Sequence, residues 1–370
     1  MRFGAAPTMF AALVVLAPGC TTRDSDEFRH PVQIEVFEVK AGEEMVPAPP
    51  LRLVTEYDAG QKTTFSYVVS DAELFRVTGS SQSTLCSNIH CANITSVAVH
   101  NGTVYLGAEN NPNGGNSCPE GATGKVLRIA KNADCFILKD DSDAPKPDVI
   151  FEGDVRNLDI SVDNTLRWTG TRAVHSITEP DTCTTSPLCP NRITELGQPA
   201  ILEAITVDDN KNAYVTSAQK SAAGCDRLPI WKVETDGTKV VTGLGDLKAC
   251  AIDIVYAPTN EQGGVDAALF WVDVGTLEVF RASLADETQS VVASGFTSPI
   301  AIAADGDHVY WLDRGKLGES DGALWRYDRR STEVDVLADG LDEPTDIALE
   351  RDRIYWIERG GSNRLMTLSK

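Results

Sequence analysis

Two copies of one pattern lie near the C-terminal end of the chain and constrain its fold more than any other feature. Residues 298–313 contain SPIAIA followed by VYWLD, and residues 343–358 contain EPTDIA followed by IYWIE. The spacing from Tyr310 to Tyr355 is a period of about 45 residues. Short apolar runs that recur at a fixed spacing of this size, interrupted by Gly and Asp, are typical of a β-propeller or a solenoid.

The same unit can be followed backwards to the region of residue 51. Each unit contains an inner strand, a second strand with an aromatic or apolar motif, and a third strand in which apolar residues precede a polar one. This third-strand marker occurs at 74–76, 127–128, 174–175, 231–232, 280–281, 325–326 and 366–367. We therefore expect an all-β protein, a β-propeller of seven blades. Six or eight blades stay open as alternatives, because the first and third units match the pattern least.

The last unit has no fourth strand of its own, because the sequence ends at Lys370, directly after the seventh third strand. Residues 31–39 alternate between apolar and polar side chains, as a half-buried strand does. We expect this N-terminal strand to close the ring, which would remove two exposed sheet edges. The propeller would then span residues 31–370, and other fourth strands are expected at 135–138, 240–241, 291–292 and 334–337.

The YWLD run at 310–313 and the GLDEP lead-in at 340–344 resemble the YWTD and NHL-type β-propeller repeats. The resemblance is carried by residues 249–370. YWTD propellers usually have six blades, so the expected count of seven departs from that family. Family members use the Tyr, Trp and Asp of the motif mainly for packing and for hydrogen bonds between blades. The resemblance implies the same structural role here for Tyr310, Trp311, Asp313, Tyr355 and Trp356.

Residues 1–19 are predicted to be an export signal, because Arg2 precedes an apolar run at 9–16 that is too short to span a membrane. Residues 17–20 (APGC) resemble a bacterial lipobox, in which cleavage leaves a lipidated Cys at the N-terminus. We expect lipidation of Cys20, followed by a polar tether over 20–30. The protein would then sit in a bacterial cell envelope, at the outer membrane, in the periplasm or on the cell surface. Secretion after ordinary signal cleavage is the alternative.

The cysteine count agrees with export. The chain has nine Cys, and setting Cys20 aside leaves an even number, which in an exported protein predicts four disulfides. The sequence cannot determine the pairing. Close spacing favours Cys86 with Cys91, Cys183 with Cys189, and Cys225 with Cys250, and Cys118 with Cys135 follows by elimination.

The net charge of −21 argues against nucleic acid and anionic lipid surfaces as partners, since both have the same sign of charge. We therefore expect no nucleic-acid binding, membrane contact only through the lipid anchor, and a monomer. The sequence contains no nucleophile elbow, zinc-binding helix motif, phosphate loop or dinucleotide fingerprint.

One group of residues could bind a metal ion. Aligned on the inner strand, Asp159, Asp253 and Asp346 share one position in three different units. Inner strands of a propeller start beside the central channel, so the three carboxylates would converge and recruit a hard cation such as Ca²⁺. The alternative is that each Asp accepts hydrogen bonds from backbone amides where its blade begins. No other cofactor is expected.

These observations predict a binding or scaffold module for a protein or a small ligand. The alternative is a metal-dependent hydrolase or lactonase with its site at the channel mouth, as in related propeller enzymes. The inner strands contain no His for such a site, which argues against catalysis. The long loops 107–124 and 217–227 between second and third strands are expected at the same mouth, where a rigid scaffold would present them to a ligand.

Overall fold

The computed structural model describes the greater part of the chain, namely residues 32–37, 52–69, 73–78, 81–87, 93–109, 124–130, 135–136, 148–160, 164–180, 182–183, 192–196, 201–221, 224–234, 240–241, 247–260, 264–360 and 363–370. Within these ranges the regular elements are all β-strands. They include no helix of the length and apolar character needed to cross a membrane. The predicted signal, Cys20 and the predicted tether lie outside the described residues.

Blades 1 to 3 are formed in chain order from the inner strand outward. Their strands are β2 (Arg52–Asp58), β3 (Thr63–Val69), β4 (Glu73–Thr78) and β5 (Ser81–Ser87) in blade 1; β6 (Asn93–His100), β7 (Thr103–Glu109), β8 (Lys125–Ile129) and β10 (Asp148–Glu152) in blade 2; and β11 (Asn157–Ile160), β12 (Thr165–Thr169), β13 (Ala173–Thr178) and β14 (Arg192–Glu195) in blade 3. A two-residue strand, β9 (Cys135–Phe136), joins the sheet of blade 1.

Blades 4 to 7 follow the same plan. Their strands are β15 (Ile201–Val207), β16 (Ala213–Ser221), β19 (Trp231–Val233) and β20 (Val240–Val241) in blade 4; β22 (Ala251–Ala257), β23 (Ala268–Asp273), β24 (Glu278–Ser283) and β25 (Gln289–Ser294) in blade 5; β26 (Pro299–Ala304), β27 (His308–Asp313), β28 (Gly322–Asp328) and β29 (Val334–Leu341) in blade 6; and β30 (Pro344–Glu350), β31 (Arg353–Glu358), β32 (Asn363–Ser369) and β1 (Val32–Phe37) in blade 7. Short strands β17 (Gly224–Asp226), β18 (Leu228–Pro229) and β21 (Lys248–Ala249) extend the loops of blade 4.

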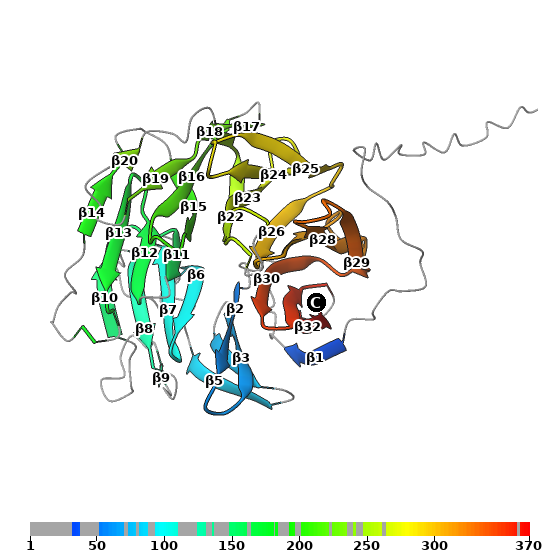
Figure 1. Cartoon of the computed structure of the whole chain (residues 1–370). Coiled ribbons are helices and arrows are strands. Elements are labelled where there is room, and N and C mark those ends of the chain that lie inside the picture. Colours follow the sequence, from blue (N-terminus) through cyan, green and yellow to red (C-terminus); the bar gives the residue numbers. More distant parts are fainter. Residues whose placement is uncertain are drawn as a thin grey trace, which may run out of the picture.

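The seven blades form a closed ring. Each inner strand contacts the inner strands of the two neighbouring blades, in the cyclic order β2, β6, β11, β15, β22, β26 and β30. Figure 1 shows these sheets arranged around a central axis. The structure therefore confirms the seven-bladed β-propeller, and the alternatives of six or eight blades are wrong.

The hydrophobic core lies between the faces of adjacent blades, because the second strand of each blade has neighbours on both sides. Every residue of β23 is buried, and the same holds for β12. The motif tryptophans Trp271, Trp311 and Trp356 are each 0% exposed. Their packing role agrees with what the repeat resemblance implied.

The N-terminal strand closes the ring as expected. β1 pairs antiparallel with β32, the third strand of blade 7, so that Val32 is opposite Thr367 and Phe37 is opposite Asn363. In Figure 1 the blue β1 lies beside the red β32. The last blade thus takes its outermost strand from the other end of the chain.

One predicted fourth strand is wrong. Residues 135–138 were expected to complete blade 2, but β9 pairs in parallel with β5 of blade 1, and β10 is the fourth strand of blade 2. Burial explains the difference: Ile150 and Phe151 of β10 pack in a cluster with Trp168 of blade 3, so this strand has an apolar surface to cover. The predicted fourth strands at 240–241, 291–292 and 334–337 are confirmed.

Candidate functional site

The candidate site is the end of the ring at which the inner strands begin, which we call the entry end. The loops between second and third strands lie at this end too, because each second strand runs antiparallel to its inner strand. In β6, β15, β22, β26 and β30 a β-bulge marks the start of the inner strand. Bulges of this kind redirect the side chain that follows.

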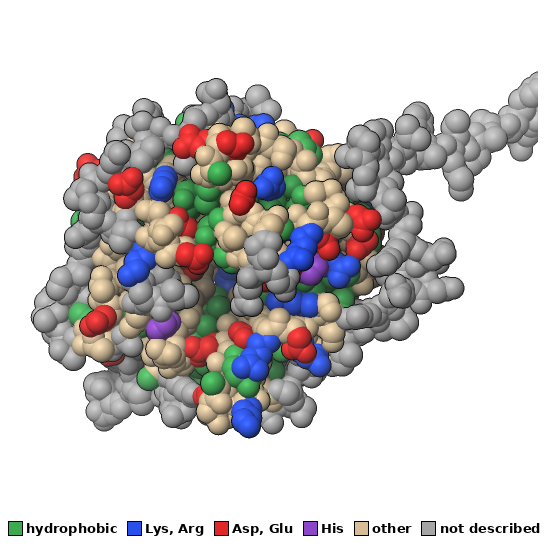
Figure 2. Space-filling model, viewed as in Figure 1, with side chains coloured by type: hydrophobic (Ala, Val, Ile, Leu, Met, Phe, Trp, Pro, Cys, Tyr) green, Lys and Arg blue, Asp and Glu red, His purple; other side chains and the backbone are tan. Residues whose placement is uncertain are grey.

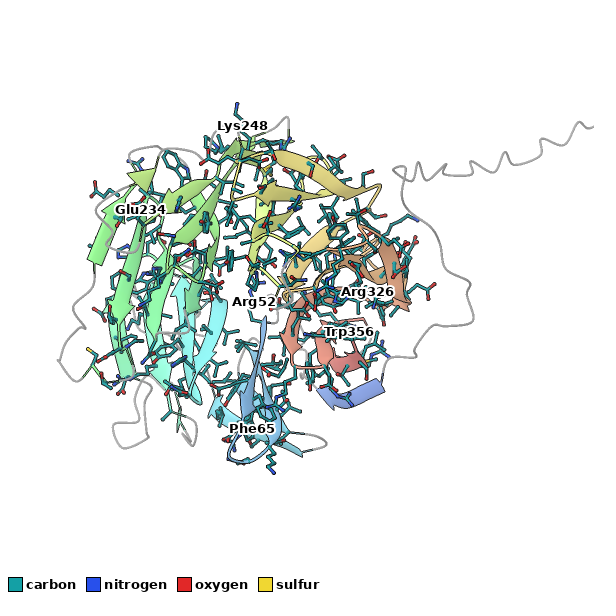
Figure 3. The ribbon with its side chains drawn as sticks, in the orientation of Figure 1. Arg52, Phe65, Glu234, Lys248, Arg326 and Trp356 are labelled. Carbon is teal, nitrogen blue, oxygen red and sulfur yellow. A yellow bond between two sulfur atoms is a disulfide. The ribbon has the colours of Figure 1, made fainter. Side chains whose placement is uncertain are left out.

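Seven residues hold equivalent register positions at the start of the inner strands, and we call them the axis ring. Each lies opposite the second-strand residue that follows the motif Trp or its counterpart; for example, Asp253 lies opposite Val272, directly after Trp271. In blade order the axis ring is Arg52, Ser96, Asn157, Ala204, Asp253, Ala301 and Asp346. Figure 3 labels Arg52 close to the middle of the ring of blades.

Asp253 and Asp346 link neighbouring blades. The Oδ2 atom of Asp253 accepts a hydrogen bond from the backbone N–H of Ile302 in the next blade, at 2.9 Å. The Oδ1 atoms of both residues accept from the N–H of the residue that follows each of them, at 3.0 Å in both cases. The axis-side edge of an inner strand has N–H groups with no strand beside them, and a buried N–H needs an acceptor. The two carboxylates provide these acceptors.

Asp159 does not belong to the axis ring, and its expected shared position is therefore wrong. It lies opposite Arg167, whereas Asn157 occupies the equivalent position opposite Thr169. Asp159 is two residues further along the strand than Asn157, which places it roughly 7 Å further from the entry end. Its Oδ1 atom accepts from the N–H of Ile160 at 2.8 Å, and a backbone hydrogen bond from Val207 links it to the next blade.

Thr206 forms a matching link in this second layer. Its Oγ1 atom accepts from the backbone N–H of Tyr256 in the next blade, at 3.1 Å. The side-chain period of a strand is two residues, so positions two apart face the same way. The two layers of links therefore use the same side of the inner strands, at two depths along the axis.

The sequence analysis missed one member of the axis ring, the cation Arg52. Its Nε–H donates to the carbonyl oxygen of Thr95 in the next blade, at 2.7 Å. The positive charge of Arg52 acts on both Asp253 and Asp346 and favours their ionised forms. The signal for Arg52 was present in the sequence, because Arg52-Leu53 occupies the place of Asp346-Ile347 in the repeat.

The carboxyl groups hold their protons unusually tightly. Burial raises the pKa of Asp253 to about 7, and the neighbouring charge of Asp346 adds to the effect. Burial also raises the pKa of Asp346 and takes the pKa of Asp159 to about 6. Blade 6 contributes only the small Ala301 between Asp253 and Asp346, so no larger side chain separates the two charges.

The hydrogen bonds agree with the amide-acceptor alternative for these aspartates. Among the described residues, no group of three or more His, Cys, Asp or Glu side chains is placed to hold a metal ion. The Ca²⁺ site at Asp159, Asp253 and Asp346 stays a prediction. The histidines for which a strand position is described, His100, His175 and His308, lie outside the axis ring.

The predicted cysteine pairs are described in part. The disulfide between Cys225 and Cys250 is confirmed, with Cα atoms 6.0 Å apart. Cys183 is also disulfide-bonded. For Cys86 and Cys135 the structure describes the backbone alone, while Cys91, Cys118 and Cys189 lie outside the described residues. The same holds for residues 110–123 of the predicted loop at 107–124.

Comparison with solved structures identifies the architecture. YCF48, solved with a D1 peptide bound, aligns with a TM-score of 0.56 at 9% identity, over 98% of this chain and 100% of that chain. The extracellular domain of a hybrid two component system from Bacteroides thetaiotaomicron aligns with a TM-score of 0.56 at 12% identity, over 92% of this chain and 42% of that one. The shared fold is the β-propeller. At such identities the likeness concerns the fold alone. No protein-family model and no curated protein matches the chain.

Proposed function

We propose that this propeller is an exported, lipid-anchored binding module that receives a protein partner at its entry end. The observation that carries the proposal is Leu317, which is 75% exposed. It lies in the loop between β27 and β28, which extends beyond the start of the inner strand of blade 6. An apolar side chain this exposed is a good contact for a partner, because burying it in an interface is favourable.

The loop that presents Leu317 is held in one conformation. The N–H of Lys316 donates to Asp321 Oδ1 at 2.7 Å, and the N–H of Gly318 donates to Glu343 Oε1 at 2.7 Å. Gly315 has a φ of 71°, and a Cβ at this position would collide with Asp321. A loop that is already ordered loses little conformational entropy when a partner binds.

A second apolar side chain lies on the corresponding loop of the neighbouring blade. Leu277, in the turn between β23 and β24, is 38% exposed. The Oδ1 atom of Asp273 fixes this turn by accepting from the N–H groups of Gly275 and Thr276, at 3.0 and 3.2 Å. Two ordered loops of neighbouring blades therefore each present an exposed leucine at the entry end, and this favours a protein over a small ligand.

The direction of β1 supports presentation of this end away from a membrane. Val32 pairs with Thr367 near the end of β32, whereas Phe37 pairs with Asn363 at its beginning. The chain therefore enters the propeller at the end opposite Leu317. A tether from a lipidated Cys20 would reach the ring at that opposite end, and the entry end would face outward.

Charge offers no competing docking surface on the face in view. Figure 2 shows acidic and basic side chains interspersed around a hollow near the middle of the ring. On the part of this face that Figure 2 colours by type, neither sign of charge is gathered into one patch. The structural neighbour YCF48 was solved with a peptide bound, which is a precedent for peptide binding by a propeller.

Site-specific photo-cross-linking tests the proposal. A photoreactive amino acid replaces Leu317 in one variant and Val291 in the other, and the full chain is expressed in its native envelope. Val291 is a matched control, because it is 48% exposed on the outer strand β25, away from the entry end. We expect a discrete adduct from position 317 alone. Equal adducts from both positions, or none from position 317, would show that the entry end is not the binding surface.

A further inference from the structure

The parallel pairing of β5 and β9 places two cysteines opposite each other. Cys86 of β5 is the register partner of Cys135 of β9, and Ser87 is the partner of Phe136. β5 is the outermost strand of blade 1, whereas β9 comes from the connection between β8 and β10 of blade 2. The pairing thus brings a segment of blade 2 onto the edge of blade 1.

We propose that Cys86 and Cys135 form a disulfide that ties blade 2 to blade 1. Neighbouring strands lie roughly 4.8 Å apart, and disulfides join Cα atoms separated by roughly 4.4–6.8 Å. Residues that are register partners in adjacent strands also share one face of the sheet. A pairing only two residues long gains little from backbone hydrogen bonds, so a covalent bond explains how it persists.

This pairing differs from the two pairs expected from spacing, Cys86 with Cys91 and Cys118 with Cys135. If the disulfide-bonded Cys183 pairs with Cys189, as their spacing predicts, the bond between Cys225 and Cys250 leaves Cys91 with Cys118 as the remaining pair. Such a bond would pin the long loop between β7 and β8 to the start of blade 2.

Formation of the bond requires an oxidising compartment. The two thiols of Cys86 and Cys135 lose two protons and two electrons to a disulfide oxidant, which is reduced to two thiols while the new S–S bond forms. Such oxidants maintain disulfides in the periplasm and outside the cell, but not in the cytosol. The inference rests on strand pairing alone, so it does not depend on the proposed binding surface.

Thiol counting in paired variants tests the assignment. All variants contain Cys20→Ser and are exported, denatured without reductant and labelled with a maleimide for intact-mass measurement. Cys86→Ser with Cys135→Ser should leave no free thiol, because both members of one bond are removed. Cys86→Ser with Cys91→Ser should expose two thiols, since it breaks two bonds. The reverse pattern would overturn the proposal.

Disulfide mapping is also carried out on the chain in which only Cys20 is replaced. This chain keeps all the other cysteines, so its result does not depend on how well the other variants fold. Thermolysin cuts before large apolar residues and can separate Cys86 from Cys91 at Ile89. Without reductant, we expect a cross-linked product containing Cys86 and Cys135 that separates into two peptides on reduction. Recovery of Cys86 linked to Cys91, or of Cys86 and Cys135 as free thiols, would also refute the bond.

Discussion

Asp346 accepts a hydrogen bond from the backbone N–H of Leu53 at 2.8 Å, although 293 residues separate the two in the chain. This contact joins the inner strand of the last blade to the inner strand of the first. The antiparallel pairing of β1 with β32 closes the same ring at the outer edge of blade 7. The ring is therefore closed in two places: a side chain closes it between the inner strands, and a strand closes it at the outer edge of blade 7.

Removal of the Asp346 carboxylate should weaken the inner closure. In Asp346→Ala the N–H groups of Leu53 and Ile347 both lose their acceptor. We expect the free energy of unfolding to fall by about 2 kcal/mol, the typical cost of leaving buried donors unsatisfied. Urea unfolding measures the change. The matched control is Asp339→Ala on the exposed side of β29, and an equal loss in both variants would contradict the closure role.

Stability should depend on pH because of the raised carboxyl pKa values. Burial raises the pKa of Asp253 to about 7 and of Asp159 to about 6, so the folded state holds protons that the unfolded state releases. The stabilising contribution is complete below the unfolded value of about 4 and is lost as pH rises toward 7. We expect the free energy of unfolding to fall by on the order of 1 kcal/mol per group between pH 5 and pH 8.

Asp253→Asn separates this effect from other titrations. Because the amide does not ionise, the slope of unfolding free energy between pH 5 and pH 8 should be shallower in the variant than in the wild type. Asp305 has the opposite effect: because its pKa is lowered in the folded state, its contribution to the free energy of unfolding is lost as the pH falls. Although desolvation works against it, hydrogen bonds from His308 and Lys370 keep the pKa of Asp305 below its usual range. Identical slopes in wild type and Asp253→Asn would rule out Asp253 as the source.

Deletion of residues 31–39 should open the ring. It would remove β1 and leave the outer edge of β32 unpaired, while the other edge of β32 still pairs with β31. We expect a loss of several kcal/mol, in the range of the largest single-site effects on stability. Thermal melting measures the loss, with deletion of the tether 21–30 as the control. An unchanged melting temperature after deletion of residues 31–39 would count against closure by β1.

Cys20→Ser tests the anchor, which lies outside the described residues. If Cys20 is lipidated, the variant should leave the membrane fraction while the wild type stays in it, because the acyl chains provide the membrane affinity. Cell fractionation followed by immunoblotting measures the distribution. The soluble variant should retain the melting temperature of the wild-type propeller. Retention of Cys20→Ser in the membrane at the wild-type level would disprove anchoring through this residue.

Calcium addition distinguishes the two interpretations of the aspartates. If the aspartates serve only as amide acceptors, Ca²⁺ should leave the melting temperature unchanged, because hydrogen bonds occupy carboxylate oxygens of Asp253 and Asp346 and Asp159 lies in a deeper layer. A bound ion at a hundredfold excess over its Kd would instead add roughly 2.7 kcal/mol of stability. A rise with Ca²⁺ that disappears in Asp253→Asn would establish the metal site and revive the hydrolase alternative.

Several features of the fold could be predicted from the sequence because they repeat locally. Most second strands contain a continuous apolar run, and each third strand has its marker, so seven blades could be proposed from the sequence, with six or eight as alternatives. The alternation in residues 31–39 indicated a strand, and the missing fourth strand of the last unit indicated where it belongs. The pair Cys225 and Cys250 could also be proposed from spacing, and the structure confirms it.

Tertiary structure alone decided which side chains meet at the axis. One-dimensional alignment placed Asp159 with Asp253 and Asp346, but strand register puts Asn157 in that place, because a shift of two residues preserves the face of a strand while changing its depth. Arg52 holds the repeat position of Asp346, but its charge acts on Asp253 and Asp346 only because ring closure brings the first blade beside the last. The partnership of Cys86 with Cys135 likewise depends on a loop of blade 2 lying against blade 1. A repeat in sequence determines the shape of each blade through local hydrophobic periodicity, whereas the contacts between blades depend on ring closure, which brings together residues that are hundreds of positions apart.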